Sequence, residues 1–199
     1  MPKIIRLTTV IGAIGVLAVV IAACGSDDET SATSAESAQT LSLNGEKTVL
    51  ALDPDTAKVL TENKVEVAPV DPASAGQDGI AFPITGGEVD SETLAGTIDH
   101  SGGLEFSVGK TNVALTDFVV DTTAGTLTAT TPDGAKLVTL DLDLTGLERT
   151  DKEDGTIIAS GIVATLSNDA AAALNDAFSV ELFKGGLTIG DVTVTATAG

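Results

Sequence analysis

Short runs in which apolar and polar residues alternate dominate the second half of the chain. In the clearest of them, LVTLDLDL, the residues Leu140, Leu142 and Leu144 alternate with Asp141 and Asp143. A period of two is that of a β-strand, whose successive side chains point to opposite faces of a sheet. The pattern therefore predicts a strand with leucines on a buried face and carboxylates on a solvent face.

Similar runs surround this strand, and turn signals separate them. The runs are rich in Thr and Val, which favour half-buried pleated surfaces. Pro132-Asp133-Gly134 is a strong turn sequence between two of them. The other predicted strands cover residues 112–120, 126–131, 156–166 and 191–198.

A helix is predicted after the run at 156–166. Ser167 or Asn168 is a residue of the type that caps helices, and the sequence DAAAALNDAF follows. Ala170, Leu174 and Phe178 then recur every four residues, which places them on one helical face. We expect this face to pack on the sheet.

A second short helix is predicted earlier in the chain. Asp53 precedes Pro54, an arrangement that puts a capping residue before a proline at the first helical position, and TAKVLTEN follows. Strands at this spacing with two short helices indicate an all-β domain. The architecture expected is an antiparallel β-sandwich or a barrel-like domain.

The N-terminus has the layout of an export signal. Lys3 and Arg6 form a positive start, residues 10–23 are apolar, and Cys24 follows Ala22-Ala23. This placement of the sole cysteine resembles a bacterial lipobox. The resemblance implies removal of a lipoprotein signal peptide at 1–23, lipidation of Cys24 and attachment to the membrane through acyl chains.

The predicted organisation has three parts. Residues 1–23 are the signal peptide, residues 24–46 are the lipidated cysteine and a disordered tether, and residues 47–199 are the β domain. The tether is assigned because it is rich in Ser, Ala, Thr and acidic residues and lacks aromatics. The predicted location is the outer face of the cytoplasmic membrane, in the cell envelope.

The charge of the chain excludes one class of partner. It carries 29 acidic against 10 basic side chains, a net charge of −19. Such a protein repels phosphate backbones, so we expect no nucleic-acid partner. The acidic residues are expected to be solvated rather than to bind a metal, because none of their groups has the spacing of a calcium loop.

No arrangement of residues indicates an enzyme. His100 is the only histidine, and its neighbours Asp99 and Ser101 would point away from it in an extended segment. Zinc normally takes several His or Cys ligands, and Cys24 is expected to carry lipid. We therefore predict a non-enzymatic protein without a metal site.

Aromatic residues are few. The chain has no Trp and no Tyr, and rings of this kind usually stack on sugars, bases or flat cofactors. The five phenylalanines stand among apolar neighbours and are predicted to anchor the core. They are Phe82, Phe106, Phe118, Phe178 and Phe183.

Seven segments that follow one another carry a family resemblance. They are FPITGG (82–87), GTIDHSGGLEF (96–106), LTDFVVD (115–121), GTLTA (125–129), LDLDLTGL (140–147), VATLSNDAAAALNDAF (163–178) and GGLTIGDVTVT (185–195). Their order and spacing resemble the HtaA domain family, exported β-rich domains of Gram-positive bacteria associated with haem uptake. The resemblance covers most of residues 81–195.

The resemblance implies a role for His100. In the haem-binding members a tyrosine early in the domain holds the haem iron, and a histidine supports it. His100, in DHSGGL, matches that histidine, whereas this chain has no tyrosine. His100 is therefore a candidate haem ligand, and the alternative is a structural histidine where a strand meets a turn at Gly102 and Gly103.

Two functional hypotheses follow. The first is a cell-envelope lipoprotein whose β domain is a scaffold or interaction module for an envelope protein partner. The alternative is a protein that binds haem or another small ligand during envelope uptake, using His100 and a pocket lined by phenylalanines.

Overall fold

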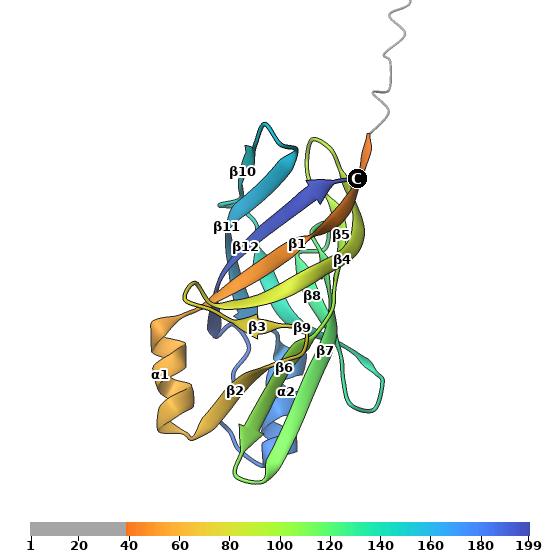
Figure 1. Cartoon of the computed structure of the whole chain (residues 1–199). Helices are drawn as coiled ribbons and strands as arrows, with labels where there is room; N and C mark the ends of the chain where they lie inside the picture. The colour runs from red at the N-terminus through yellow and green to blue at the C-terminus, as the bar shows by residue number, and fades with distance from the viewer. Residues whose placement is uncertain (1–38) are drawn as a thin grey trace, which may run out of the picture. The chain divides into compact units, whose positions relative to one another are not determined.

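A computed structural model describes residues 39–199. They form an antiparallel β-structure with two helices, α1 (Pro54–Glu62) and α2 (Asn168–Phe178) (Figure 1). The strands are β1 (Thr40–Leu52), β2 (Val65–Val70), β3 (Ser74–Ala75), β4 (Ile80–Asp90), β5 (Gly96–His100), β6 (Gly103–Val108), β7 (Thr111–Asp121), β8 (Thr126–Thr130), β9 (Lys136–Asp143), β10 (Glu148–Asp151), β11 (Thr156–Leu166) and β12 (Thr188–Ala198).

Eight of the strands close into a ring. Their order is β7-β5-β4-β1-β12-β11-β9-β8, and β8 pairs with β7 again. Closure gives hydrogen-bond partners to the backbone N–H and C=O groups that an open sheet would leave unpaired along its edge strands. Of the two architectures expected from the alternation, the chain therefore adopts the barrel, and the all-β prediction is confirmed.

The remaining elements extend this barrel. β2 pairs with β6, β3 with β4, and β10 with β11, each outside the ring. α1, α2 and the β6–β7 hairpin lie at one end of the barrel, and β10 lies at the other (Figure 1). We call the first end the mouth and the second the far end.

The strand predicted from Leu140, Leu142 and Leu144 is confirmed as β9. Leu140 and Leu142 are buried in the barrel, while Asp141 and Asp143 are exposed. Burial of the leucines removes apolar surface from water, which is the main force that holds such a strand in place.

Both predicted helices are present with the expected caps. The Asp53 side chain accepts a hydrogen bond from the Thr56 amide at 2.9 Å, and Pro54 is the first helical residue of α1. Ser167, rather than Asn168, caps α2 by accepting from the Ala170 amide at 3.0 Å. These bonds satisfy amides that the first helical turn leaves free.

The start of the β domain differs from the prediction. Residues 40–46 were assigned to the tether, but they form the first part of β1 and pair with β4 and β12. Leu43 is buried in the core, and Gly45 and Glu46 take positive φ at an irregularity in the strand. This irregularity interrupts the alternation of apolar and polar residues, and the segment is polar in composition. For these two reasons the sequence does not show that the segment forms a strand.

The barrel is complete within one part of the chain. All strands of the described residues lie in the compact unit Ser37–Gly199, and the buried apolar residues form one continuous cluster there. A chain that begins at Ser37 therefore contains everything that the described fold needs. Among residues 39–199 no helix is long and apolar enough to cross a membrane.

Candidate ligand cavity and the buried His100

His100 is the last residue of β5 and is buried, with 6% of the residue's surface exposed. Its Nε2 lies 2.6 Å from Thr48 Oγ1 on β1, and its Nδ1 lies 3.2 Å from the carbonyl oxygen of Phe118 on β7. The ring therefore connects three strands of the barrel.

The partners of His100 define its tautomer. A carbonyl oxygen only accepts hydrogen bonds, so Nδ1 must carry the proton that it donates to Phe118. In the neutral ring Nε2 is then an acceptor, and the Thr48 hydroxyl donates to it. Burial lowers the pKa of His100, opposed by the Phe118 carbonyl and the negative charge of Asp99. His100 is thus a neutral ring with both nitrogens occupied.

The turn after His100 depends on two glycines. Gly102 has φ of +82°, and a Cβ there would meet the backbone of Val70 and Ala73. A Cβ on Gly103 would meet the backbone of Leu115. Only glycine fits such close approaches. His100 therefore does stand where a strand meets a glycine turn.

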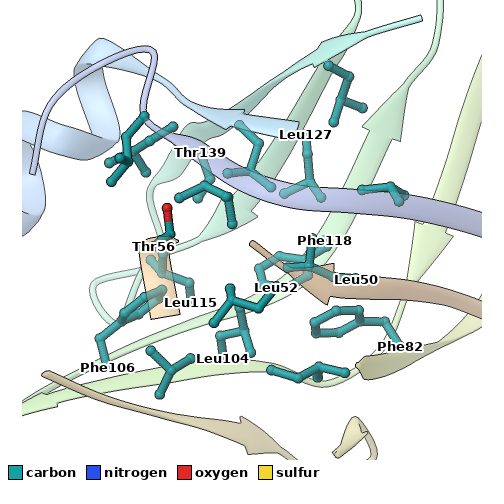
Figure 2. A pocket seen from close by; sticks show the side chains of 18 of the residues that line it. Leu50, Leu52, Thr56, Phe82, Leu104, Phe106, Leu115, Phe118, Leu127 and Thr139 are labelled. Atoms are coloured by element: carbon teal, nitrogen blue, oxygen red, sulfur yellow. The ribbon is translucent and has the colours of Figure 1, made fainter. Parts of the chain in front are cut away.

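A cavity of about 70 Å³ lies at the mouth of the barrel. Figure 2 shows that apolar side chains from β1, β4, β6 and β7 point into it. α1, α2 and the segment before β12 also contribute to its lining. Leu52, Phe106 and Ile189 line this cavity and are only half-buried, so it approaches the protein surface.

A second, smaller cavity of about 40 Å³ lies further along the barrel. Val120, Leu142 and Val192 line both cavities, so the two spaces adjoin at these side chains. The second lining continues through β4, β5, β11 and β12 toward the far end. We call the two the mouth cavity and the inner cavity.

The phenylalanines have both of the roles considered from the sequence. Phe82 and Phe118 are buried and pack edge to face, with ring centroids 5.1 Å apart. Four of the five phenylalanines line the mouth cavity. His100 is absent from that lining; Thr48 lines it and binds Nε2 from the cavity side.

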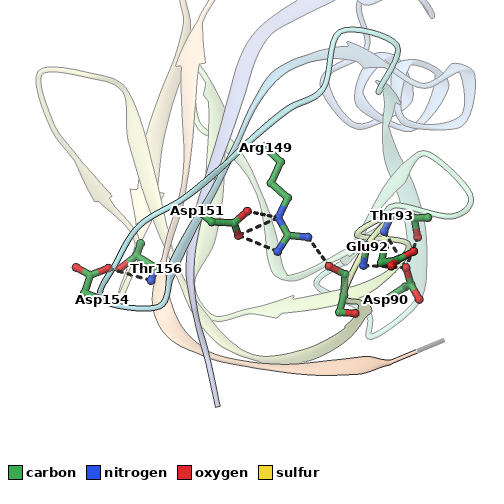
Figure 3. A network of polar contacts seen from close by, with 8 residues as sticks. Asp90, Glu92, Thr93, Arg149, Asp151, Asp154 and Thr156 are labelled. Atoms are coloured by element: carbon green, nitrogen blue, oxygen red, sulfur yellow. Dashed lines mark hydrogen bonds and ion pairs between the residues drawn. The ribbon is translucent and has the colours of Figure 1, made fainter. Parts of the chain in front are cut away.

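Several acidic side chains accept hydrogen bonds from nearby groups of the protein. Asp143 accepts from the Thr145 amide and Asp154 from the Thr156 amide. Arg149 donates to both carboxylate oxygens of Asp151 and to the carbonyl of Ser91 (Figure 3). Within residues 39–199, no three His, Cys, Asp or Glu side chains gather as a metal site would require.

Two predictions fall outside the described residues. Cys24 and the signal peptide at 1–23 precede residue 39, as does most of the tether. Lipidation of Cys24 remains a prediction.

Thr48 is the site residue that the sequence did not reveal. It sits in the run TVLAL, where Thr48, Leu50 and Leu52 alternate with Val49 and Ala51. The alternation itself was a usable signal for an inward-facing threonine. Nothing local showed that this hydroxyl would meet His100.

No protein-family model and no curated protein matches the chain. Among solved structures, the C-terminal domain of HtaA from Corynebacterium glutamicum superposes with a TM-score of 0.61 at 15% identity, over 80% of this chain and 99% of that domain. A domain-swapped dimer of the same domain, in which one histidine is replaced by alanine, gives 0.52 at 16% identity, over 73% of this chain and 91% of that one.

Residues 39–199 have an HtaA-like fold. The resemblance noted in the sequence is thereby confirmed for the fold. The heme-binding protein HtaB from the same organism superposes less well, with a TM-score of 0.44 at 12% identity, over 81% of this chain and 96% of that protein.

Proposed function

We propose that this protein is a non-enzymatic, lipid-anchored protein of the cell envelope whose HtaA-like domain binds a small apolar ligand. The observation that carries the proposal is the mouth cavity, an apolar space at the end of a barrel and close to its surface. Ligand sites occur preferentially in barrel mouths and are mostly lined by apolar and aromatic side chains. Apolar cavities exclude water and accept apolar ligands.

Haem is the first ligand to test, because the fold is HtaA-like and the HtaA family that the sequence resembles is associated with haem uptake. Histidine is a common axial ligand of haem iron. Ligation by His100 requires the Thr48 hydroxyl to leave Nε2, since one lone pair cannot serve both. Thr48 therefore controls whether His100 can reach a ligand.

The test is a haem titration of the chain from Ser37 to Gly199, followed by its Soret absorbance. Ligation by His100 predicts a Soret shift that Thr48→Val strengthens, because valine keeps the shape and frees Nε2, and that His100→Ala abolishes. Thr139→Val is the matched control, because Thr139 also lines the cavity but its hydroxyl donates to the Leu137 carbonyl. It should leave the shift unchanged.

A neutral apolar dye such as Nile red separates cavity binding from iron ligation. Dye fluorescence that rises with protein, without a Soret shift for haem, supports an apolar site that does not use His100. If neither haem nor the dye binds at tens of micromolar, the ligand-binding proposal is wrong, and the scaffold with an envelope protein partner takes its place.

The anchor has an independent test. Labelling of the full chain in cells with a radioactive fatty acid should be lost in Cys24→Ala. Retained label in that variant would contradict lipidation at Cys24.

A further inference from the structure

The two cavities offer a ligand no hydrogen-bonding group. Their only polar side chains are the threonines Thr48, Thr56, Thr122 and Thr139. Thr48 binds His100, Thr56 donates to the Thr188 carbonyl at 2.5 Å, and Thr122 donates to the Leu94 carbonyl at 2.6 Å. Thr139 donates to the carbonyl of Leu137. A ligand therefore gains only hydrophobic and dispersion contacts there.

The two cavities are placed one after the other. Val120, Leu142 and Val192 belong to both linings, so the two spaces adjoin at these three side chains. The result is an apolar column that starts near the surface at the mouth and continues inside the barrel. Its volumes, about 70 and 40 Å³, are small beside the 300–1,000 Å³ of sites for compact drug-sized ligands.

This chemistry and shape select one class of ligand. A haem needs partners for its iron and for two carboxylates, whereas a saturated hydrocarbon chain needs none and is one methylene wide. The charge of the protein disfavours an anionic head group, because a net charge of −19 repels anions.

We propose that the barrel binds a single saturated hydrocarbon chain with an uncharged polar head. The tail extends from the mouth cavity past Val120 into the inner cavity, and the head stays at the mouth near Phe106 and Ile189. This assignment rests on the proposed function, because it names the ligand class of the same cavity.

The test measures displacement of Nile red from the Ser37–Gly199 chain by monoacylglycerols from octanoyl to palmitoyl. Each methylene that becomes buried should raise the affinity about fourfold. The rise should stop at the length that fills the inner cavity. Fatty acids of matched length should bind more weakly at pH 7 than at a pH that protonates them.

Variants at the boundary between the cavities sharpen the test. Val120→Phe should close the passage, so that long chains lose their advantage while octanoyl binding changes little. Val119→Phe is the matched control, because Val119 is the neighbouring residue on β7 and lines neither cavity. Val120→Ala should widen the passage and strengthen binding of long chains, which keeps the test decisive if Val120→Phe fails to fold.

The outcomes separate the two proposals. If the dye or haem binds but affinity does not depend on chain length, the cavity binds a ligand and the hydrocarbon assignment is wrong. If long chains bind Val120→Phe and Val119→Phe equally well, the tail does not pass Val120 and the assignment is also wrong. If no apolar probe binds, both proposals fail together.

Discussion

The two ends of the barrel are stabilised by different interactions. At the mouth, α1, α2 and the β6–β7 hairpin cover phenylalanine and leucine side chains around a cavity, and the few hydroxyls there are internally bonded. At the far end, Arg149 pairs with Asp151 on the same strand, β10, and connects β10 to the β4–β5 loop by donating to the Ser91 carbonyl. Mutations should therefore cost far more at the mouth, where groups are desolvated, than at the far end.

The largest effect is expected from Phe118→Ala. Phe118 is buried against Phe82, and the substitution leaves a larger void, which costs about 3–5 kcal/mol of unfolding free energy. Urea unfolding measures this loss of unfolding free energy. Val59→Ala, at an exposed position of α1, should change stability by less than about 0.5 kcal/mol. A loss below about 1 kcal/mol for Phe118→Ala would mean that the mouth collapses readily around the missing ring.

His100→Ala should have the next largest effect, about 3 kcal/mol. It leaves the Thr48 hydroxyl and the Phe118 carbonyl without their partner, and each buried unpaired group costs about 1–3 kcal/mol. Chemical denaturation of the variant measures the loss. Asp99→Ala on the same strand is the control, because Asp99 is exposed and should tolerate the change. Equal stability of the two variants would contradict a structural role for His100.

The third prediction concerns pH. Because burial lowers the pKa of His100 below its usual 6.5, the unfolded chain binds the proton more readily than the folded chain does. The stability that the neutral, buried His100 ring contributes is complete above about pH 6.5. It is lost as the pH falls toward the folded-state pKa, and the free energy of unfolding then changes by up to about 1.4 kcal/mol per pH unit. Unfolding free energies measured between pH 7 and about pH 5 test this, and His100→Gln should remove the slope.

The loss of stability that comes from protonating Asp90 is expected at a lower pH than the loss that comes from His100. Hydrogen bonds from Thr93, first its amide and then its hydroxyl, lower the pKa of Asp90 below 3.8, so its contribution is lost only in stronger acid. A slope that persists above pH 5 in His100→Gln would therefore point to a group other than His100 or Asp90.

The smallest effect is expected at the far end, from Arg149→Ala. The guanidinium donates to Asp151 at 2.7 Å, but the Asp151 side chain is 57% exposed, and such pairs contribute about 0–1 kcal/mol. Adding salt should shrink the difference from the unmodified protein further. Lys152→Ala is the control for simple loss of positive charge. A loss above about 2 kcal/mol for Arg149→Ala would erase the contrast between the two ends.

Strands with regular alternation or a long β-branched run were predictable from the sequence, and strands without either signal were not. β9 was expected because its apolar residues follow a period of two, and β11 because its residues form a β-branched, apolar run. β4 carries Pro83 and adjacent glycines, and β5 is short, so neither shows a clear period. The start of β1 was missed for the related reason that Gly45 and Glu46 form an irregularity.

The candidate site was predictable only in part. His100 and the phenylalanines stood out by residue type, since one is rare in this chain and the others are large and apolar. Thr48 and the leucines of the lining have no distinguishing composition. They became site residues only because β1, β6, β7 and β9 bring them around one space.

Local physics thus determined the strand periods, the helix caps at Asp53 and Ser167, and the acidic surface, because each depends on neighbours a few residues apart. Only the tertiary structure decided the closure of the ring, the two cavities and the pairing of His100 with Thr48, which are 52 positions apart. Such contacts depend on how distant strands align, and no pattern within one strand encodes that alignment.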